Sequence, residues 1–77
     1  MSLRELSMVT IDLHGVRYRD VYQRLEKQCV KGEVPFVVIT GHSNTMKTIV
    51  SQIAEQFGYF IEDKLGNEGR VIVYERR

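Results

Sequence analysis

The chain has 77 residues, which is enough for one domain of two packed layers but no more. Its hydrophobic content of 43% is typical of a globular domain, and no apolar stretch approaches the roughly 20 residues that cross a membrane. The net charge of +1 lacks the large basic excess of a strong nucleic-acid binder, so any such surface must be a local patch.

The first predicted element is a strand. Residues alternate between apolar and polar from Met8 to Leu13, which gives the strand one strongly apolar face. The residues of that face are Val9, Ile11 and Leu13. Gly15 follows directly and ends the strand in a turn.

An amphipathic helix is predicted from Tyr18 to Val30, because apolar residues recur there at spacings of three and four. Gly32 is a suitable end for it. Tyr18 and Tyr22 lie on the apolar stripe, so we expect both in the core. Cys29 is expected in the core too. Because it is the single cysteine, the chain cannot form an internal disulfide, which favours a reducing, cytoplasmic location. The apolar positions are Tyr18, Val21, Tyr22, Leu25, Cys29 and Val30.

The next strand and helix carry the clearest patterns in the chain. The unbroken run Phe36–Ile39 predicts a central strand covered on both faces, and Gly41 ends it. Ser43, Asn44 or Thr45 can cap the helix that follows. Apolar residues then recur at helical spacing as far as Phe57, and Gly58 is well placed beyond the helix end.

Two further strands complete the chain. Residues 59–65 mix aromatic and charged side chains, as an edge strand does, and residues 66–69 form a glycine-containing turn into a last strand, Arg70 to Glu75. The order β-α-β-α-β-β predicts an α/β two-layer sandwich with a mixed four-stranded sheet. The first two strands are parallel through a right-handed crossover, the last two are antiparallel, and two helices leave one sheet face partly open. The strand order stays open.

The only histidines, His14 and His42, each follow an apolar strand and precede a helix. If the two strands are parallel, both histidines lie at the edge where open α/β sheets bind ligands. Asp12 stands two residues before His14. Its carboxylate either orients the imidazole for acid–base chemistry or simply bonds a backbone amide and shapes the turn.

The start of the second helix offers a place for a phosphate, because its first N–H groups lack partners and carry the positive end of the helix dipole. Gly41 would let a ligand approach the backbone closely. The alternative is an ordinary capped helix start. The other predicted phosphate contacts are Arg17, Ser43, Asn44 and Lys47.

Two imidazoles at one edge suit phosphodiester cleavage, in which one group deprotonates the nucleophile and another protonates the leaving oxygen. A divalent cation held by Asp12, His14 and His42 is the less favoured scheme, since no close pair of histidines supports it, and no cofactor is firmly implied. Tyr18, Tyr22, Tyr59 and Tyr74 would stack on bases only where they are exposed.

The segment Asp12-Leu13-His14-Gly15 resembles the L-D-L-H-G signature of the Smr (small MutS-related) domain family, with Ile11 in place of the leading leucine. Thr40-Gly41 after an apolar strand resembles the second family motif, H-G-x-G or T-G-x-G. Gly66 to Gly69 with the strand after it resembles the closing turn. The resemblance spans residues 9–74, and two departures stand in the second motif: Ser43 replaces its last glycine, and His42 occupies its variable position.

The resemblance implies a stand-alone Smr-like domain over residues 1–77, with a fold like the C-terminal domain of bacterial translation initiation factor three. It also implies nucleic-acid binding with nicking or endonuclease activity on DNA or RNA, and it carries motif roles to Asp12, His14, Gly15 and Gly41. We therefore expect an endonuclease that uses His14 and His42 as the acid–base pair. The alternatives are a non-catalytic nucleic-acid-binding module and a protein-interaction domain that pairs through residues 59–65. The oligomeric state is open.

Overall fold

The computed structural model describes residues 9–63 and 69–75. The predicted order β-α-β-α-β-β is confirmed. The elements are β1 (Thr10–Asp12), α2 (Tyr18–Lys31), β2 (Phe36–Ile39), α3 (Asn44–Gln56), β3 (Tyr59–Asp63) and β4 (Arg70–Glu75). Met8 and residues 64–68, which the sequence assigns to the first strand and the last hairpin, lie outside the described residues.

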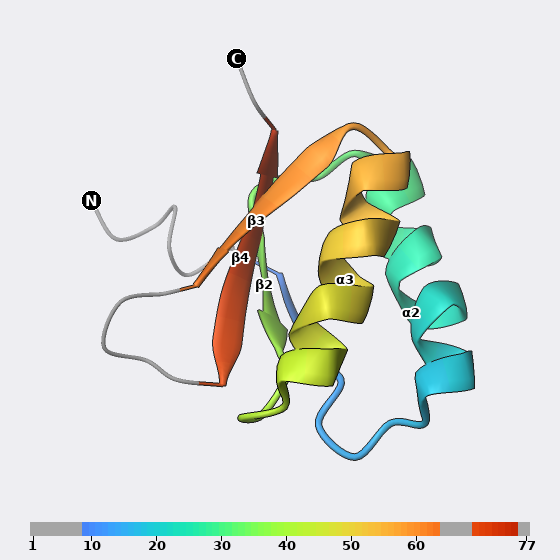
Figure 1. Cartoon of the computed structure of the whole chain (residues 1–77). Helices are drawn as coiled ribbons and strands as arrows, with labels where there is room; N and C mark the ends of the chain where they lie inside the picture. The colour runs from blue at the N-terminus through green and yellow to red at the C-terminus, as the bar shows by residue number, and fades with distance from the viewer. Residues whose placement is uncertain (1–8, 64–68, 76–77) are drawn as a thin grey trace.

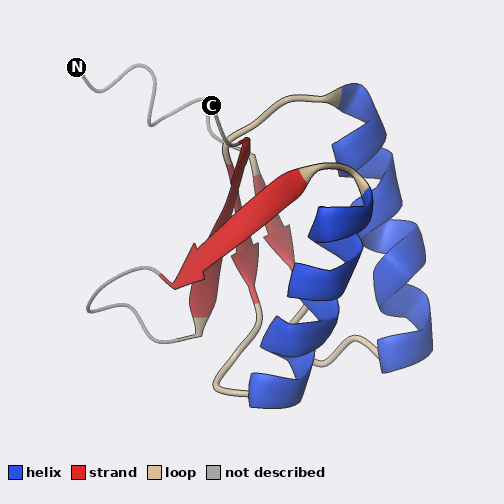
Figure 2. Cartoon of the chain, turned by 45° about the horizontal axis from the view of Figure 1, so that its top comes forward, coloured by secondary structure: helices blue, strands red, loops and turns tan. Residues whose placement is uncertain are grey.

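The strands form one mixed sheet in the order β1-β2-β4-β3. β1 and β2 are parallel, with Asp12 opposite Ile39, whereas β4 is antiparallel to both β2 and β3. Both helices pack on the same face of this sheet, so the domain has two layers (Figures 1 and 2). The last hairpin thus places β4 inside the sheet and leaves β3 at an edge, as its charged residues predict.

The core lies between the sheet and the two helices. The sheet contributes the inward side chains of alternate residues, and each helix contributes one stripe. The fully buried members with the largest volumes are Phe36, Leu13, Leu25, Val21, Val38, Val50, Val71 and Val73. Cys29 is 4% exposed, as predicted, and burial raises the pKa of its thiol.

The central position of β2 is confirmed, and Phe36, Val37 and Val38 are all buried. Among the described residues, however, both helices cover only one of its faces (Figure 1). Val37 lies on the other face between Thr10 and Ile72, its partners in β1 and β4. The expectation that one sheet face is partly open is therefore confirmed.

The expected burial of the tyrosines of α2 is wrong. Tyr18 is 52% exposed and Tyr22 41%, and Val30, which the same stripe includes, is 69% exposed. The stripe of α2 is wider than the surface that meets the sheet and α3. Gln28 takes a buried place beside Cys29, and its side-chain amide donates to the backbone oxygen of Glu33 at 3.2 Å. A polar residue with a satisfied amide thus occupies a position that an apolar pattern alone does not predict.

The difference between the two sides of α2 can be tested with one substitution at two positions. Val21→Ala removes fully buried methyl groups and should lower the free energy of unfolding by about 2 kcal/mol. Val30→Ala should change it by less than about 0.5 kcal/mol, because the side chain is mostly in water and alanine favours the helix. Urea denaturation followed by circular dichroism measures both, and equal losses would contradict the packing of α2.

Candidate functional site

The two parallel strands deliver their following turns to the same end of the sheet. β1 ends at Asp12 and β2 at Ile39, and these residues are opposite each other in the ladder. Leu13 extends the pairing by donating its N–H to the oxygen of Ile39 at 2.8 Å. Each chain then turns toward its helix, so the predicted meeting of the His14 and His42 turns at one edge is confirmed.

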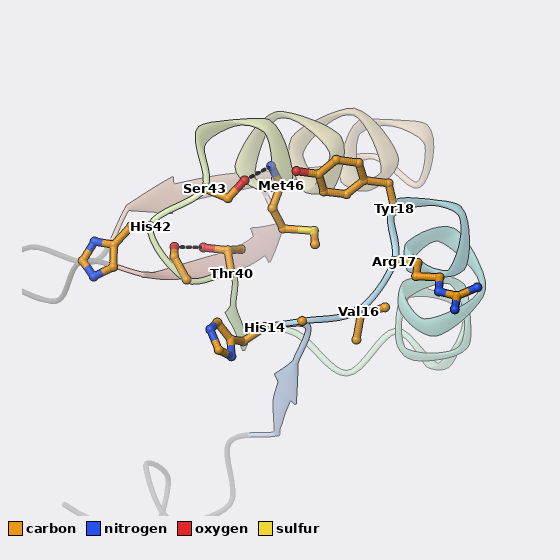
Figure 3. A pocket seen from close by; sticks show the side chains of 10 residues that line it. His14, Val16, Arg17, Tyr18, Thr40, His42, Ser43 and Met46 are labelled. Atoms are coloured by element: carbon orange, nitrogen blue, oxygen red, sulfur yellow. Dashed lines mark hydrogen bonds between the residues drawn. The ribbon is translucent and has the colours of Figure 1, made fainter.

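A cleft of about 590 Å³ lies between the two turns, and we call it the rim cleft (Figure 3). Its lining residues are His14, Gly15, Val16, Arg17, Tyr18, Thr40, Gly41, His42, Ser43 and Met46. Both histidines are exposed. Figure 3 shows their rings at separate places on the rim, with His42 pointing outward, so the imidazoles share the cleft without facing each other.

Close packing fixes the position of the His14 ring. A Cβ atom built on Gly41 would lie 3.0 Å from His14 Cδ2, so the imidazole rests directly on the Gly41 backbone. Gly69 also packs closely against Gly41. A Cβ atom built on Gly69 would lie 3.4 Å from backbone atoms of Gly41. The N–H groups of Thr40 and Gly41 both donate to the Gly69 oxygen, at 2.7 and 3.0 Å.

The Asp12 carboxylate makes a backbone contact. Its Oδ1 accepts a hydrogen bond from the backbone N–H of His14 at 2.9 Å. This is the turn-shaping alternative of the two that the sequence leaves open. The contact that the structure gives Asp12 therefore orients the turn that carries His14, and it does not involve the imidazole ring.

The first turns of both long helices border the rim cleft. α2 begins after Arg17, whose side chain makes no capping hydrogen bond, and α3 begins after Ser43, whose Oγ accepts from the Met46 N–H at 3.0 Å. Ser43 is thus the cap among the three predicted candidates. The first N–H groups of a helix have no partner within it, and the dipole makes this end positive. Two such ends meet at one cleft, which favours an anionic ligand.

The structure brings together only some of the predicted phosphate contacts. Arg17, Gly15, Gly41 and Ser43 line the rim cleft, although Figure 3 shows the Arg17 side chain reaching outward. Asn44 and Lys47 line a different hollow, beside Ile61 and Asp63 of β3. Lys47 Nζ lies 3.7 Å from Asp63 Oδ1, because the helical turn rotates this side chain toward β3.

Three lining residues were not expected in a site, and these are Val16, Thr40 and Met46; Tyr18 was expected to contact a ligand only if exposed. Met46 is 3% exposed and begins the apolar stripe of α3, and Thr40 is 2% exposed with its hydroxyl donating to the Gly41 oxygen at 2.9 Å. Tyr18 was assigned to the core by its spacing. Thr40 belongs to the segment that resembles the second Smr motif, whereas the only sequence signal for Val16 and Met46 is their closeness to the two histidine turns.

A metal site gains no support from the described part of the chain. Over residues 9–63 and 69–75, no group of three histidine, cysteine, aspartate or glutamate side chains is placed to hold an ion. Within the same ranges, no helix has the length and apolar character needed to cross a membrane. No family model, curated protein or solved structure matches this chain.

The contact between Gly41 and His14 predicts a difference between two alanine substitutions. Gly41 and Gly58 both have positive φ angles, +71° and +83°, but a Cβ on Gly58 would meet nothing within 4 Å. Gly58→Ala should cost about 1 kcal/mol of stability from backbone strain alone. Gly41→Ala adds the collision with the imidazole and should cost at least about 2 kcal/mol.

Thermal unfolding of the two variants measures this difference. The histidine resonances in an NMR spectrum should also shift for Gly41→Ala and stay in place for Gly58→Ala. Equal stabilities with unshifted histidine signals would contradict the close packing of His14 on Gly41.

Proposed function

We propose that this chain is a nucleic-acid-binding domain that cleaves phosphodiester bonds, as an endonuclease of the Smr type. The observation that carries the proposal is the rim cleft, where an exposed imidazole is held against a glycine turn between two helix N-termini. Positive helix ends can bind the phosphate of a phosphodiester, and an imidazole is the side chain most often used for proton transfer in its cleavage.

Binding of the phosphate rests on the backbone and on Arg17. In this proposal, first-turn N–H groups of α2, and those of α3 that Ser43 does not cap, donate to the phosphate. Arg17 adds a guanidinium on the outer side of the cleft. Lys47 pairs with Asp63 and does not line the cleft. The attraction for the phosphate therefore comes from the helix starts and from Arg17.

The cleavage chemistry is assigned to the two imidazoles. One removes the proton of the attacking hydroxyl or water, and the other gives a proton to the leaving oxygen. In an in-line displacement the attacking and leaving oxygens lie on opposite sides of phosphorus. Figure 3 shows the imidazoles at separate places on the rim with His42 pointing outward, so this scheme requires the His42 ring to turn toward the cleft. The helix N–H groups stabilise the charge that develops on the phosphate oxygens.

The resemblance to the Smr signature supports the same proposal. The motif residues Asp12, His14, Gly15 and Gly41 all stand at the edge of the sheet where the cleft lies. Asp12 accepts a hydrogen bond from the backbone N–H of His14, and the His14 ring lies against Gly41. Asp12 and Gly41 therefore both contact His14.

A nucleic-acid-binding module without catalysis is the second candidate. One observation favours it: the Asp12 carboxylate is bonded to the His14 backbone and not to the ring that it would orient during proton transfer. Binding is common to both candidates, so the cleavage assay separates them.

Cleavage should depend on His14. Incubation with labelled RNA and with supercoiled DNA should show cutting of at least one substrate, and His14→Ala should slow it by about 100-fold or more. Gln52→Ala, an exposed change on α3 away from the rim cleft, should cut at the wild-type rate. If wild type and His14→Ala cut at the same background rate and both still bind, the domain is a nucleic-acid-binding module without catalysis.

The same assay separates the chemical schemes. Activity that persists in EDTA favours the two imidazoles, whereas its loss favours a divalent cation at Asp12, His14 and His42. An RNA substrate with a single 2′-deoxy residue at the cut site stops transesterification and leaves water attack unaffected.

Binding should weaken steeply with salt, because each neutralised phosphate releases a counterion. Arg17→Ala should lower the slope of log K against log salt by about 1. Arg24→Ala removes another exposed arginine of α2 that does not line the rim cleft, and it should leave the slope closer to wild type. Fluorescence anisotropy with a short labelled oligonucleotide measures both. A flat salt response, or equal effects of the two variants, would contradict the phosphate role of Arg17.

A further inference from the structure

Tyr18 is an aromatic residue that the fold leaves in solvent beside the rim cleft. It falls on the apolar stripe of α2, yet it is 52% exposed, whereas Val21 one turn later is fully buried. Tyr18 is the first residue of α2 and is not among the residues that α2 buries. Its ring therefore contributes little to the core.

The position of the ring connects it to the site. Tyr18 lines the rim cleft together with His14 and Arg17. In Figure 3 its ring extends from the start of α2 across the cleft toward Met46 at the start of α3. Val16 adds a second apolar side chain to the same cleft.

The cleft thus has two kinds of surface. The helix N-termini and the imidazoles are suited to an anion, whereas the Tyr18 ring and the Val16 side chain offer apolar surface that an anion alone would not contact favourably. A nucleotide unit carries both a phosphate and a flat base, and base–aromatic stacking tolerates any sequence because every base has a π-face. The volume of about 590 Å³ is within the range of pockets for ligands of this size.

We infer that the Tyr18 ring stacks on an unpaired nucleobase next to the phosphate held in the rim cleft, so that the domain takes single-stranded nucleic acid in preference to duplex. This inference rests on the proposed function and names its substrate class. In a duplex, both faces of each base are covered by its neighbours, and a base becomes available to Tyr18 only after it is unstacked.

The test compares three labelled ligands by fluorescence anisotropy at low salt. One is a single strand about 10 nucleotides long, the second an abasic strand with the same number of phosphates, and the third the matching duplex. The wild type should bind the base-bearing strand about tenfold more tightly than the abasic strand. It should also bind that strand more tightly than the duplex.

Variants assign the preference to one ring. Tyr18→Leu should bind the base-bearing and abasic strands alike, and Tyr18→Phe should keep the wild-type preference because the phenyl ring still stacks. Tyr22→Leu is the matched control: this tyrosine is 41% exposed on the same helix but does not line the rim cleft, so the preference should stay. Thermal unfolding checks that each variant is folded, as expected for exposed positions.

A direct readout comes from the absence of tryptophan in the chain. Tyr18→Trp places a single indole at the cleft, and its fluorescence should be quenched by the base-bearing strand and not by the abasic one.

The outcomes separate this inference from the proposed function. Equal wild-type affinity for base-bearing and abasic strands, for single strand and duplex, or an equal loss in Tyr22→Leu would overturn the role of Tyr18 and leave phosphate binding standing. Failure of every strand to bind at low salt would overturn both.

Discussion

The architecture of the site depends on the close stacking of three chain segments at one edge of the sheet. Gly41 lies between the imidazole of His14 and the backbone of Gly69, with only a hydrogen atom in place of a side chain. Two hydrogen bonds to the Gly69 oxygen bind the β2 turn to the start of β4, and the parallel pairing of β1 and β2 brings the His14 turn beside it. One side of the exposed His14 ring therefore lies against the backbone of Gly41.

The same arrangement explains how so small a domain can form a site without weakening its core. The core is made from the helix-facing side chains of the sheet and one stripe of each helix. The rim cleft lies beyond the strand ends, where the helix starts leave backbone N–H groups that need partners in any case. Ser43 satisfies one of them at α3, whereas the side chain of Arg17 makes no capping bond at α2. A ligand at this rim would use donors that the fold already exposes.

Patterns local in the sequence predicted most of the fold. β2 and β4 have the predicted bounds, and α2 begins at Tyr18, because unbroken or alternating apolar runs bounded by glycines depend little on distant residues. The strand order depends on which edge receives the last hairpin, a tertiary choice that no local pattern contains. The meeting of His14 and His42 followed from topology alone. The directions of Tyr18 and Lys47 did not, since each depends on where a helix sits over the sheet.

The residues around the rim cleft are of two kinds. Some make contacts that define the shape of the cleft, and others present exposed rings to it. Asp12 bonds the His14 backbone, Gly41 accommodates the ring, and Ser43 caps α3, so the departure of Ser43 from the glycine of the Smr motif concerns the helix start and not the imidazole. His14 and Tyr18 present exposed rings to the same cleft. Tyr18 is 52% exposed, so about half of its surface remains available to a ligand at the cleft. The ligand that we propose has one acidic part, which the helix starts would hold, and one flat apolar part, which would stack on Tyr18.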